Sequence, residues 1–207
     1  MLIHPWDAST DPIEARDFLR TQGFGQLIAA GQGRAVPVVV PTQYVLDGDT
    51  RVLLHLARPN PIWAAVEENP TVLLAVAGDW AFIPSAWKAV GAEDPALGIP
   101  TTYYAAVQLT ARAEVVDDDA GKAEILRRQQ GALDPAGAWV DPAEHGLLLA
   151  GIRGLRLHVT EVRSKFKYGG NADRDHRLAV AERLQERGGP GDAAARRHLM
   201  RRLGAGA

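Results

Sequence analysis

Three strand-like runs follow one another with no long helix between them, and this order most constrains the fold. The runs are FGQLIAA (24–30), RAVPVVVP (34–41) and TRVLLHLA (50–57). Gly31-Gln32-Gly33 and Asp47-Gly48-Asp49 separate them, and such sequences form tight turns between antiparallel strands. Parallel strands would need a crossover helix between them. The sequence therefore predicts a mainly β, antiparallel barrel with peripheral helices.

The rest of the chain supplies further strands and the helices. Asp11-Pro12-Ile13-Glu14 is typical of a helix start, with Asp as the N-cap and Pro at the first helical position. Further strands are predicted at 71–78, 103–116 and 153–163, and helices at 12–21, 60–68, 119–130, 142–149 and within 173–203. We expect one domain over residues 1–187 and a helical C-terminal tail over 188–207, which is not a separate domain.

Composition excludes several classes of function. Cysteine is absent, which excludes disulfides, thiolate catalysis and Cys-ligated metals, and the six histidines show no metal-binding spacing. The net charge of -2 favours neither nucleic acid nor an anionic membrane. The longest apolar runs are too short to span a bilayer, and the N-terminus lacks the pattern of a signal peptide. We therefore expect a cytoplasmic protein without a metal site.

An arginine follows the third strand-like run just where a helix is predicted to begin. Alternation places His55 on the strand face opposite its leucine neighbours, and Arg58 follows before Asn60-Pro61 opens the helix. The free N–H groups and positive dipole end of a helix start favour an anion. Arg58 could thus belong to a phosphate site; alternatively, it extends into solvent while His55 bonds a backbone carbonyl.

Two lysines alternate near the end of the last predicted strand, in RSKFKYGGN (163–171). Lys165 and Lys167 share one face, and Phe166 lies on the other. Neighbouring ammonium groups repel each other unless an anion or a carboxylate lies between them. The Gly-Gly pair that follows either allows a ligand to approach the backbone or ends the strand. The segment is thus either an anion site or a solvated strand end.

Aromatic residues gather in DWAFIPSAWK (79–88), where Trp80, Phe82 and Trp87 lie around Pro84. Such a cluster can form a cofactor wall, a subunit interface or, most commonly, a corner of the core. Trp63, Trp80 and Trp87 are more aromatic surface than one small barrel needs, which predicts a homodimer.

The run RRHLMRR (196–202) is the one strongly basic stretch of the sequence. On a helix, Arg197 and Arg201 stack at i and i+4, with Arg196 and Arg202 to either side. The run could contact DNA, which normally requires a basic face. Its terminal position and the acidic whole chain favour the alternative, a solvated helix end.

Three motifs carry a resemblance to a known family. HLARPNPIW (55–63) is close to His-Leu-Ala-Arg-Ala-Asn-Pro-x-Trp, and IPTTYYAAVQ (99–108) is similar to Val-Pro-Thr-Trp-Asn-Tyr-Ala-Ala-Val-His. SKFKYGGNADR (164–174) is similar to Lys-Phe-Lys-Leu-Ser-Gln-Asn followed by Asp-Arg. The chain thus resembles, over roughly residues 1–187, the PaiB-type FMN-binding proteins of the split-barrel class, often described as negative transcriptional regulators.

The resemblance implies a split β-barrel homodimer with FMN at the subunit interface, related in fold to pyridoxamine-phosphate oxidases. It implies that the arginine and the helix start of the first motif hold the FMN phosphate, and that the lysines of the third motif add positive charge there. The cofactor-binding residues predicted in this way are His55, Arg58, Asn60, Trp87, Lys165, Lys167 and Asn171. No residue identifies itself as catalytic.

The chain departs from the family at positions that would face the flavin ring. Thr102-Tyr103 replaces Trp-Asn, Val38-Val39 stands where a Thr-His pair is expected, and Pro84-Ser85-Ala86-Trp87 replaces Ser-Pro-Ser-Trp. Each change removes a polar group, so the ring lies in a more apolar slot or the ligand is altered or lost. The sequence leaves open a flavin-dependent oxidoreductase, a PaiB-like regulator that binds DNA, and a scaffold with a vestigial flavin site.

Overall fold

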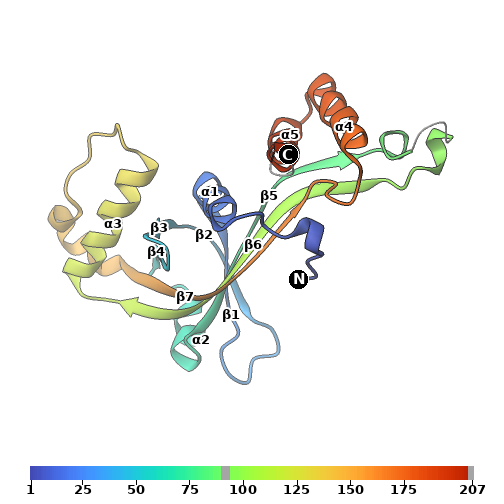
Figure 1. The fold of residues 1–207 in the computed structure, drawn as a ribbon. Helices are drawn as coiled ribbons and strands as arrows, with labels where there is room; N and C mark the ends of the chain where they lie inside the picture. The colour runs from blue at the N-terminus through green and yellow to red at the C-terminus, as the bar shows by residue number, and fades with distance from the viewer. Residues whose placement is uncertain (90–93, 205–207) are drawn as a thin grey trace. The chain divides into compact units, whose positions relative to one another are not determined.

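Within residues 1–89 and 94–204, which the computed structural model describes, seven strands form one sheet in the order β2-β1-β5-β6-β7-β4-β3 (Figure 1). The strands are β1 (Phe24–Ala29), β2 (Val38–Gln43), β3 (Val45–Asp47), β4 (Arg51–Ala57), β5 (Thr71–Ile83), β6 (Thr101–Val116) and β7 (Ile152–Lys167). β1 pairs antiparallel with β2 and β5, and β4 pairs antiparallel with β3 and β7. The hairpin predicted between the first two runs is confirmed as β1–β2. The turn at Asp47-Gly48-Asp49 instead joins β4 to β3, a short strand that the sequence did not predict, and β2 does not pair with β4.

Helices occur where capping signals predict them. The helices are α1 (Pro12–Gln22), α2 (Ile62–Glu68), α3 (Asp119–Leu133), α4 (Arg174–Arg187) and α5 (Asp192–Gly204). The 3-10 segments are η1 (Pro5–Asp7), η2 (Ser85–Trp87), η3 (Pro95–Leu97) and η4 (Pro142–Gly151). Asp11 caps α1 as predicted, because its Oδ1 accepts a hydrogen bond from the Glu14 N–H at 2.8 Å.

Three boundaries differ from the prediction. β5 continues to Ile83 instead of ending near residue 78, although Asp79 within it adopts a positive φ of 51°. β7 continues to Lys167, so that both lysines of the third motif lie on a strand. The segment predicted as a helix at 142–149 is a 3-10 segment, in which Gly146 has a φ of 53°.

The chain divides into two compact units. The terminal unit comprises Met1–Phe18, Ala77–Val107 and Arg163–Ala207, and the central unit comprises Leu19–Val76 and Gln108–Val162. β5, β6 and β7 contribute residues to both units. Helix α5, which forms most of the predicted tail, is part of the terminal unit.

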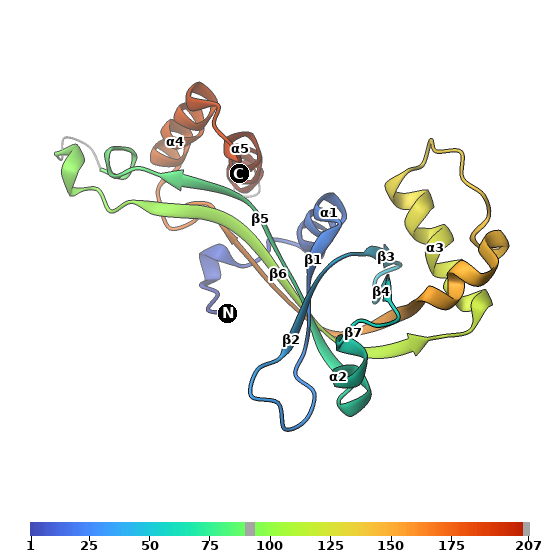
Figure 2. The same ribbon diagram turned by 180° about the vertical axis from the view of Figure 1, so that it is seen from behind.

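The central unit contains the β1–β2 and β3–β4 pairs. Helix α2 packs beside β1 and β2, and α3 packs against η4, β3 and β4 (Figure 2). Its buried apolar side chains include Leu27, Leu54, Leu74, Leu155 and Leu157. Each such side chain contributes about 1.5–3 kcal/mol when it is fully buried. The core therefore fixes the strand ends from which His55 and Arg58 project.

The terminal unit contains the end of β5, the start of β6 and the end of β7. Helices α4 and α5 pack side by side (Figure 1). Its buried side chains include Phe18, Phe166, Tyr168, Leu184 and Leu199. Phe18 meets Phe166 edge to face, with ring centroids 5.9 Å apart. This packing joins α1 to the end of β7, the strand that carries Lys165 and Lys167.

In the described part of the chain, none of the helices has the length and apolar content that crossing a bilayer requires.

Candidate functional site

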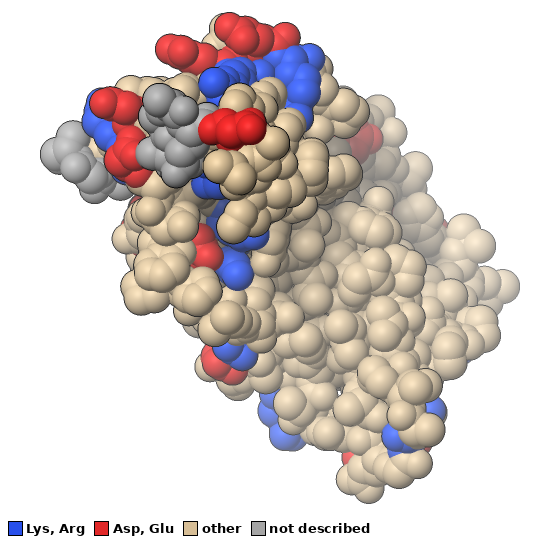
Figure 3. Space-filling view, turned by 90° about the vertical axis from the view of Figure 1, so that its right-hand side faces the viewer, with Lys and Arg blue, Asp and Glu red and all other residues tan. Residues whose placement is uncertain are grey.

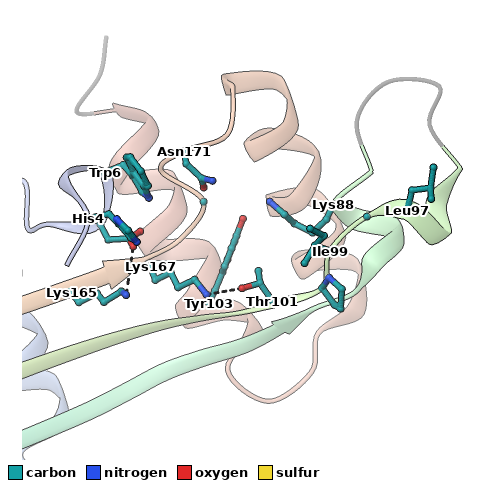
Figure 4. Close-up of a pocket in the computed structure, with 14 residues that line it drawn as sticks. His4, Trp6, Lys88, Leu97, Ile99, Thr101, Tyr103, Lys165, Lys167 and Asn171 are labelled. Atoms are coloured by element: carbon teal, nitrogen blue, oxygen red, sulfur yellow. Dashed lines mark hydrogen bonds and ion pairs between the residues drawn. The ribbon is translucent and has the colours of Figure 1, made fainter. Parts of the chain in front are cut away.

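A pocket of about 620 Å³ lies within the terminal unit (Figure 4). The N-terminal segment contributes His4, Trp6 and Asp7 to its wall. Lys88 and the start of β6 form a second side, and the end of β7 with the loop that follows forms a third. The volume falls in the range of about 300–1,000 Å³ that is typical of small-molecule sites.

Three lysines line this pocket: Lys88, Lys165 and Lys167. The two on β7 share a face, as predicted, while Phe166 between them is fully buried. Among the described residues that line the pocket, Asp7 supplies the one carboxylate. The pocket is therefore suited to an anionic ligand.

The lysines differ in how far their charges are compensated. Lys165 Nζ donates to the Leu2 carbonyl at 3.1 Å and lies 3.8 Å from Asp7 Oδ2, so its charge has a partner. Lys167 Nζ donates to Thr101 Oγ1 at 2.7 Å, a neutral acceptor. Lys88 has no ion pair among the described residues. Burial and the charge of Lys167 both lower the pKa of Lys88, and a bound anion would relieve this repulsion.

An aromatic ring lies below the two lysines of β7. The ring centroid of Tyr104 is 5.7 Å from Lys165 Nζ and 5.9 Å from Lys167 Nζ. Such cation–π contacts stabilise each ammonium group by about 0.5–1 kcal/mol at exposed sites. Tyr104 thus helps to hold two like charges on one strand face.

A flat aromatic wall closes the pocket on the N-terminal side. The rings of His4 and Trp6 are stacked, with centroids 4.7 Å apart and an interplanar angle of 10°. The segment is fixed to the terminal unit by Arg202, whose Nη1 donates to the Trp6 carbonyl at 2.9 Å. Trp6 remains partly exposed and could pack against a planar ligand ring.

Arg58 lies in the central unit and is bound within it. Its Nη2 is 2.5 Å from Asp117 Oδ1, and its Nε donates to the Ala150 carbonyl at 2.5 Å. The hydrogen bond from Arg58 lowers the pKa of Asp117. A phosphate would therefore have to compete with a bidentate carboxylate partner for this guanidinium.

His55 and Asn60 also have local partners in the central unit. His55 Nδ1 lies 2.5 Å from Gln129 Oε1, a side-chain partner in place of the backbone carbonyl considered from the sequence. Asn60 Oδ1 accepts from the Ile62 N–H at 3.1 Å, at the beginning of α2. The His55 contact joins β4 to α3, and the Asn60 contact orders the connection from β4 to α2.

The predicted cofactor-binding residues fall into two sets. The pocket brings together Lys165, Lys167 and Asn171. Trp87 belongs to the same unit, but its ring lies 4.6 Å from the guanidinium carbon of Arg187 and does not line the pocket. His55, Arg58 and Asn60 form the second set, in the central unit.

Several pocket residues are not among the predicted ones. Tyr103 lies in the second motif, and strand alternation would place it with the buried side chains of β6. No local pattern marks Lys88, His4 or Trp6, because only the tertiary structure brings them beside β7.

The aromatic residues of the sequence have separate environments. Trp63, expected at the surface, is buried in the central unit, and its Nε1 donates to the Ala57 carbonyl at 2.9 Å. Trp80 and Phe82 on β5 are 60% and 50% exposed. The interpretation of 79–88 as a corner of the core is therefore wrong for these two side chains.

The basic run of α5 is partly buried. The Arg202 side chain is buried and lies 3.4 Å from Glu14 Oε2, while Arg201 pairs with Asp11 and Asp17. The interpretation of this run as a solvated helix end is therefore wrong for Arg202.

Figure 3 shows basic and acidic side chains interspersed at the top of the view, where α4 lies. This face carries no patch of one sign among the described residues.

Comparison with protein families identifies the chain. Residues 1–161 match the family described as "Putative FMN-binding domain". The chain belongs to this family. The resemblance to PaiB-type FMN-binding proteins is thereby confirmed over most of the chain, and flavin is the cofactor that this FMN-binding family indicates. No curated protein matches the sequence.

Solved structures agree on the fold. The flavocytochrome Anf3 from Azotobacter vinelandii superposes with a TM-score of 0.62 and 23% identity, covering 84% of this chain and 75% of its own. A FAD and heme binding protein from Mycobacterium smegmatis superposes with a TM-score of 0.58 and 18% identity, covering 84% of this chain and 79% of its own. The predicted fold, an antiparallel split β-barrel with peripheral helices, is confirmed.

The terminal-unit pocket fits FMN in its chemistry. A phosphate monoester needs donors and cations, and the pocket offers ammonium groups, the Thr101 hydroxyl and the Asn171 amide. A flavin ring needs a flat apolar surface, which Trp6 provides. The donor set and the volume therefore suit this cofactor.

Proposed function

We propose that this protein binds FMN in the terminal-unit pocket, with the phosphate group held by Lys88 and Lys167. The observation that carries the proposal is the excess of lysine over carboxylate in one pocket of ligand size. Uncompensated ammonium groups at such close quarters repel each other, so an anion that lies between them is favoured.

The charges match a phosphate monoester. Asp7 offsets Lys165, and Lys88 and Lys167 then leave about two positive charges. A phosphate monoester carries about −1.5 to −2 at neutral pH. Each charge-assisted hydrogen bond is worth about 1.5–3 kcal/mol. Two such contacts would make the affinity depend strongly on the phosphate.

When bound, FMN supplies hydride and electron transfer, while the protein supplies binding and orientation. In this proposal Trp6 packs against the ring and the lysines fix the opposite end of the molecule. The likeness to a flavocytochrome and to a FAD and heme binding protein supports a redox role, a flavin-dependent oxidoreductase, over regulation of transcription.

Arg58 is a second candidate for the phosphate, suggested by its family motif. Its present partners are Asp117 and the Ala150 carbonyl, which a phosphate would replace. If a phosphate took the place of Asp117 on Arg58, the Asp117 carboxylate would remain beside Arg153, whose Nε lies 3.3 Å from Asp117 Oδ2. Lys167 has no carboxylate to give up, so we expect it to contribute more to binding than Arg58.

Paired titrations with FMN and riboflavin test the proposal. Lys167→Ala should weaken FMN binding about tenfold or more, or about 1.4 kcal/mol, and leave riboflavin binding unchanged, because riboflavin lacks the phosphate. Arg112→Ala, at an exposed position of β6, is the matched control for loss of a surface charge. Wild-type protein that binds neither compound would refute the proposal. A loss in Arg58→Ala without one in Lys167→Ala would move the phosphate to Arg58.

Self-association is a further part of the proposal. Trp80 and Phe82 are two exposed aromatic side chains that alternate on β5, and exposed aromatic pairs are typical of interfaces. In a homodimer they would be covered by the second copy. Sedimentation of Trp80→Ser and Phe82→Ser at micromolar concentration should then show weakened dimers, and a wild-type monomer would contradict this.

A further inference from the structure

A buried hydroxyl without a partner points into the lysine pocket. Tyr103 is 1% exposed and lines the pocket, and its Oη has no hydrogen-bond partner among the described residues. Figure 4 shows the ring rising from β6 with the hydroxyl between Lys88 and Asn171. A buried hydroxyl that lacks a partner is costly, so such a group in a ligand pocket indicates a missing acceptor.

The surrounding chain keeps this hydroxyl free. Gly169 has a φ of 74°, and a Cβ there would clash with Tyr103 Oη, so a side chain at 169 would displace the hydroxyl. The Tyr168 ring meets the Tyr103 ring edge to face, with centroids 5.9 Å apart. Glycine thus leaves room for the hydroxyl while Tyr168 fixes the ring.

The pocket around the hydroxyl is rich in hydrogen-bond donors. Lys88 and Lys167 carry ammonium groups, and Asn171 can offer its amide N–H. Burial raises the pKa of Tyr103 to about 12, so the phenol keeps its proton at neutral pH. A ligand group that satisfies all of them must have several acceptor oxygens and negative charge.

We infer that the Tyr103 hydroxyl donates a hydrogen bond to the phosphate group of the pocket's ligand, which is FMN if the proposed function holds. Tyr103 then discriminates phosphorylated from unphosphorylated ligands together with the lysines. It is a binding residue in a position where the related motif has asparagine. The longer tyrosine side chain takes the hydroxyl deeper into the lysine pocket than asparagine would reach.

Tyr103→Phe separates this role from a structural one. The variant should melt at the same temperature as the wild type or higher without ligand, because it removes an unpaired buried hydroxyl. Its affinity for FMN should fall about tenfold or more, while its affinity for riboflavin stays unchanged. An unchanged FMN affinity, an equal loss for both compounds, or a lower melting temperature without ligand would overturn the inference.

Tyr168→Phe is the matched control. Its hydroxyl donates to the Asp79 carbonyl at 2.8 Å, so the same deletion removes a satisfied hydrogen bond. This variant should lower the melting temperature and leave the ratio of FMN to riboflavin affinity unchanged. The same loss of FMN selectivity in both tyrosine variants would show a general packing effect and overturn the inference.

Inorganic phosphate separates failure of the inference from failure of the proposed function. Phosphate should raise the melting temperature of the wild type more than that of Tyr103→Phe, because it binds the same donors. If the wild type binds no flavin but this difference persists, the hydroxyl assignment stands and the FMN proposal fails. If phosphate stabilises both proteins equally, the hydroxyl assignment fails.

Discussion

His198 Nε2 lies 2.8 Å from Asp79 Oδ2, and this contact joins α5 to β5 within the terminal unit. The imidazole also stacks on Tyr168, with centroids 4.7 Å apart and an interplanar angle of 13°. The Tyr168 hydroxyl in turn donates to the Asp79 carbonyl. Asp79, Tyr168 and His198 therefore form one partly buried polar cluster between the strand and the C-terminal helix.

Stability should fall as the pH drops below about 6.5. Burial lowers the pKa of His198 from its ordinary value of 6.5, although Asp79 and Glu14 act in the opposite direction; Arg197 lowers it further. The unfolded chain then binds this proton at a higher pH than the folded chain. The stability that neutral His198 contributes is complete above pH 6.5. It is lost as the pH falls from 6.5 toward the lower pKa that His198 has in the folded protein.

Urea unfolding at several pH values between about 5 and 8 measures this dependence. In His198→Gln the free energy of unfolding should depend less on pH below pH 6.5 than it does in the wild type. His176→Gln should reduce this dependence separately, because burial also lowers the pKa of His176, which lies outside the contact with Asp79. A slope in His198→Gln equal to that of wild type would contradict the assignment to His198.

Asp79→Ala should destabilise the protein more than Asp79→Asn. Asp79 is the one residue other than glycine with a positive φ in the described chain, at 51°. Asparagine tolerates this conformation and keeps an acceptor for His198, whereas alanine adds a strain of about 1 kcal/mol or more and loses the acceptor. Thermal unfolding of the two variants gives the order, and equal melting temperatures would show that neither effect matters.

Removing Arg202 should be strongly destabilising. The Arg202 and Glu14 side chains are 6% and 0% exposed, so Arg202→Met would leave a buried carboxylate without its cation. Such a change costs about 3–5 kcal/mol, and Arg202→Met with Glu14→Leu should recover part of it. Chemical unfolding of both single variants and the double variant measures the coupling. A double variant as unstable as the sum of the singles would argue against direct pairing.

Deleting residues 192–207 should lower the melting temperature of the protein. Ala195, Leu199 and Leu203 are buried, and each leucine contributes about 1.5–3 kcal/mol. The substitution Arg197→Ala, at a side chain that is 63% exposed, should leave the melting temperature unchanged. This variant, rather than the deletion, is therefore suited to a test of salt-dependent DNA binding. A deletion that melts like the wild type would show that α5 adds no stability.

The antiparallel hairpin of the first two strands and much of the helix placement follow from the sequence alone. Tight turns between the first strands exclude crossover helices, and Asp11 with Pro12 marks the start of α1, because these are local backbone effects. The sequence also placed Lys165 and Lys167 on one strand face, since side chains alternate along any extended strand. These features depend on neighbours within a few residues.

Which charged groups meet depends on long-range packing that the sequence pattern does not show. Arg58 and Lys167 are both basic residues at or just after the end of a strand, yet Arg58 is bound to Asp117, whereas Lys167 donates to the neutral Thr101 hydroxyl and has no ion pair among the described residues. Lys88 and Trp6 reach the pocket from distant segments, and the buried face of α5 is set by Glu14 on α1. Periodicity assigns a face to each side chain, but the charge and burial of that face depend on long-range packing.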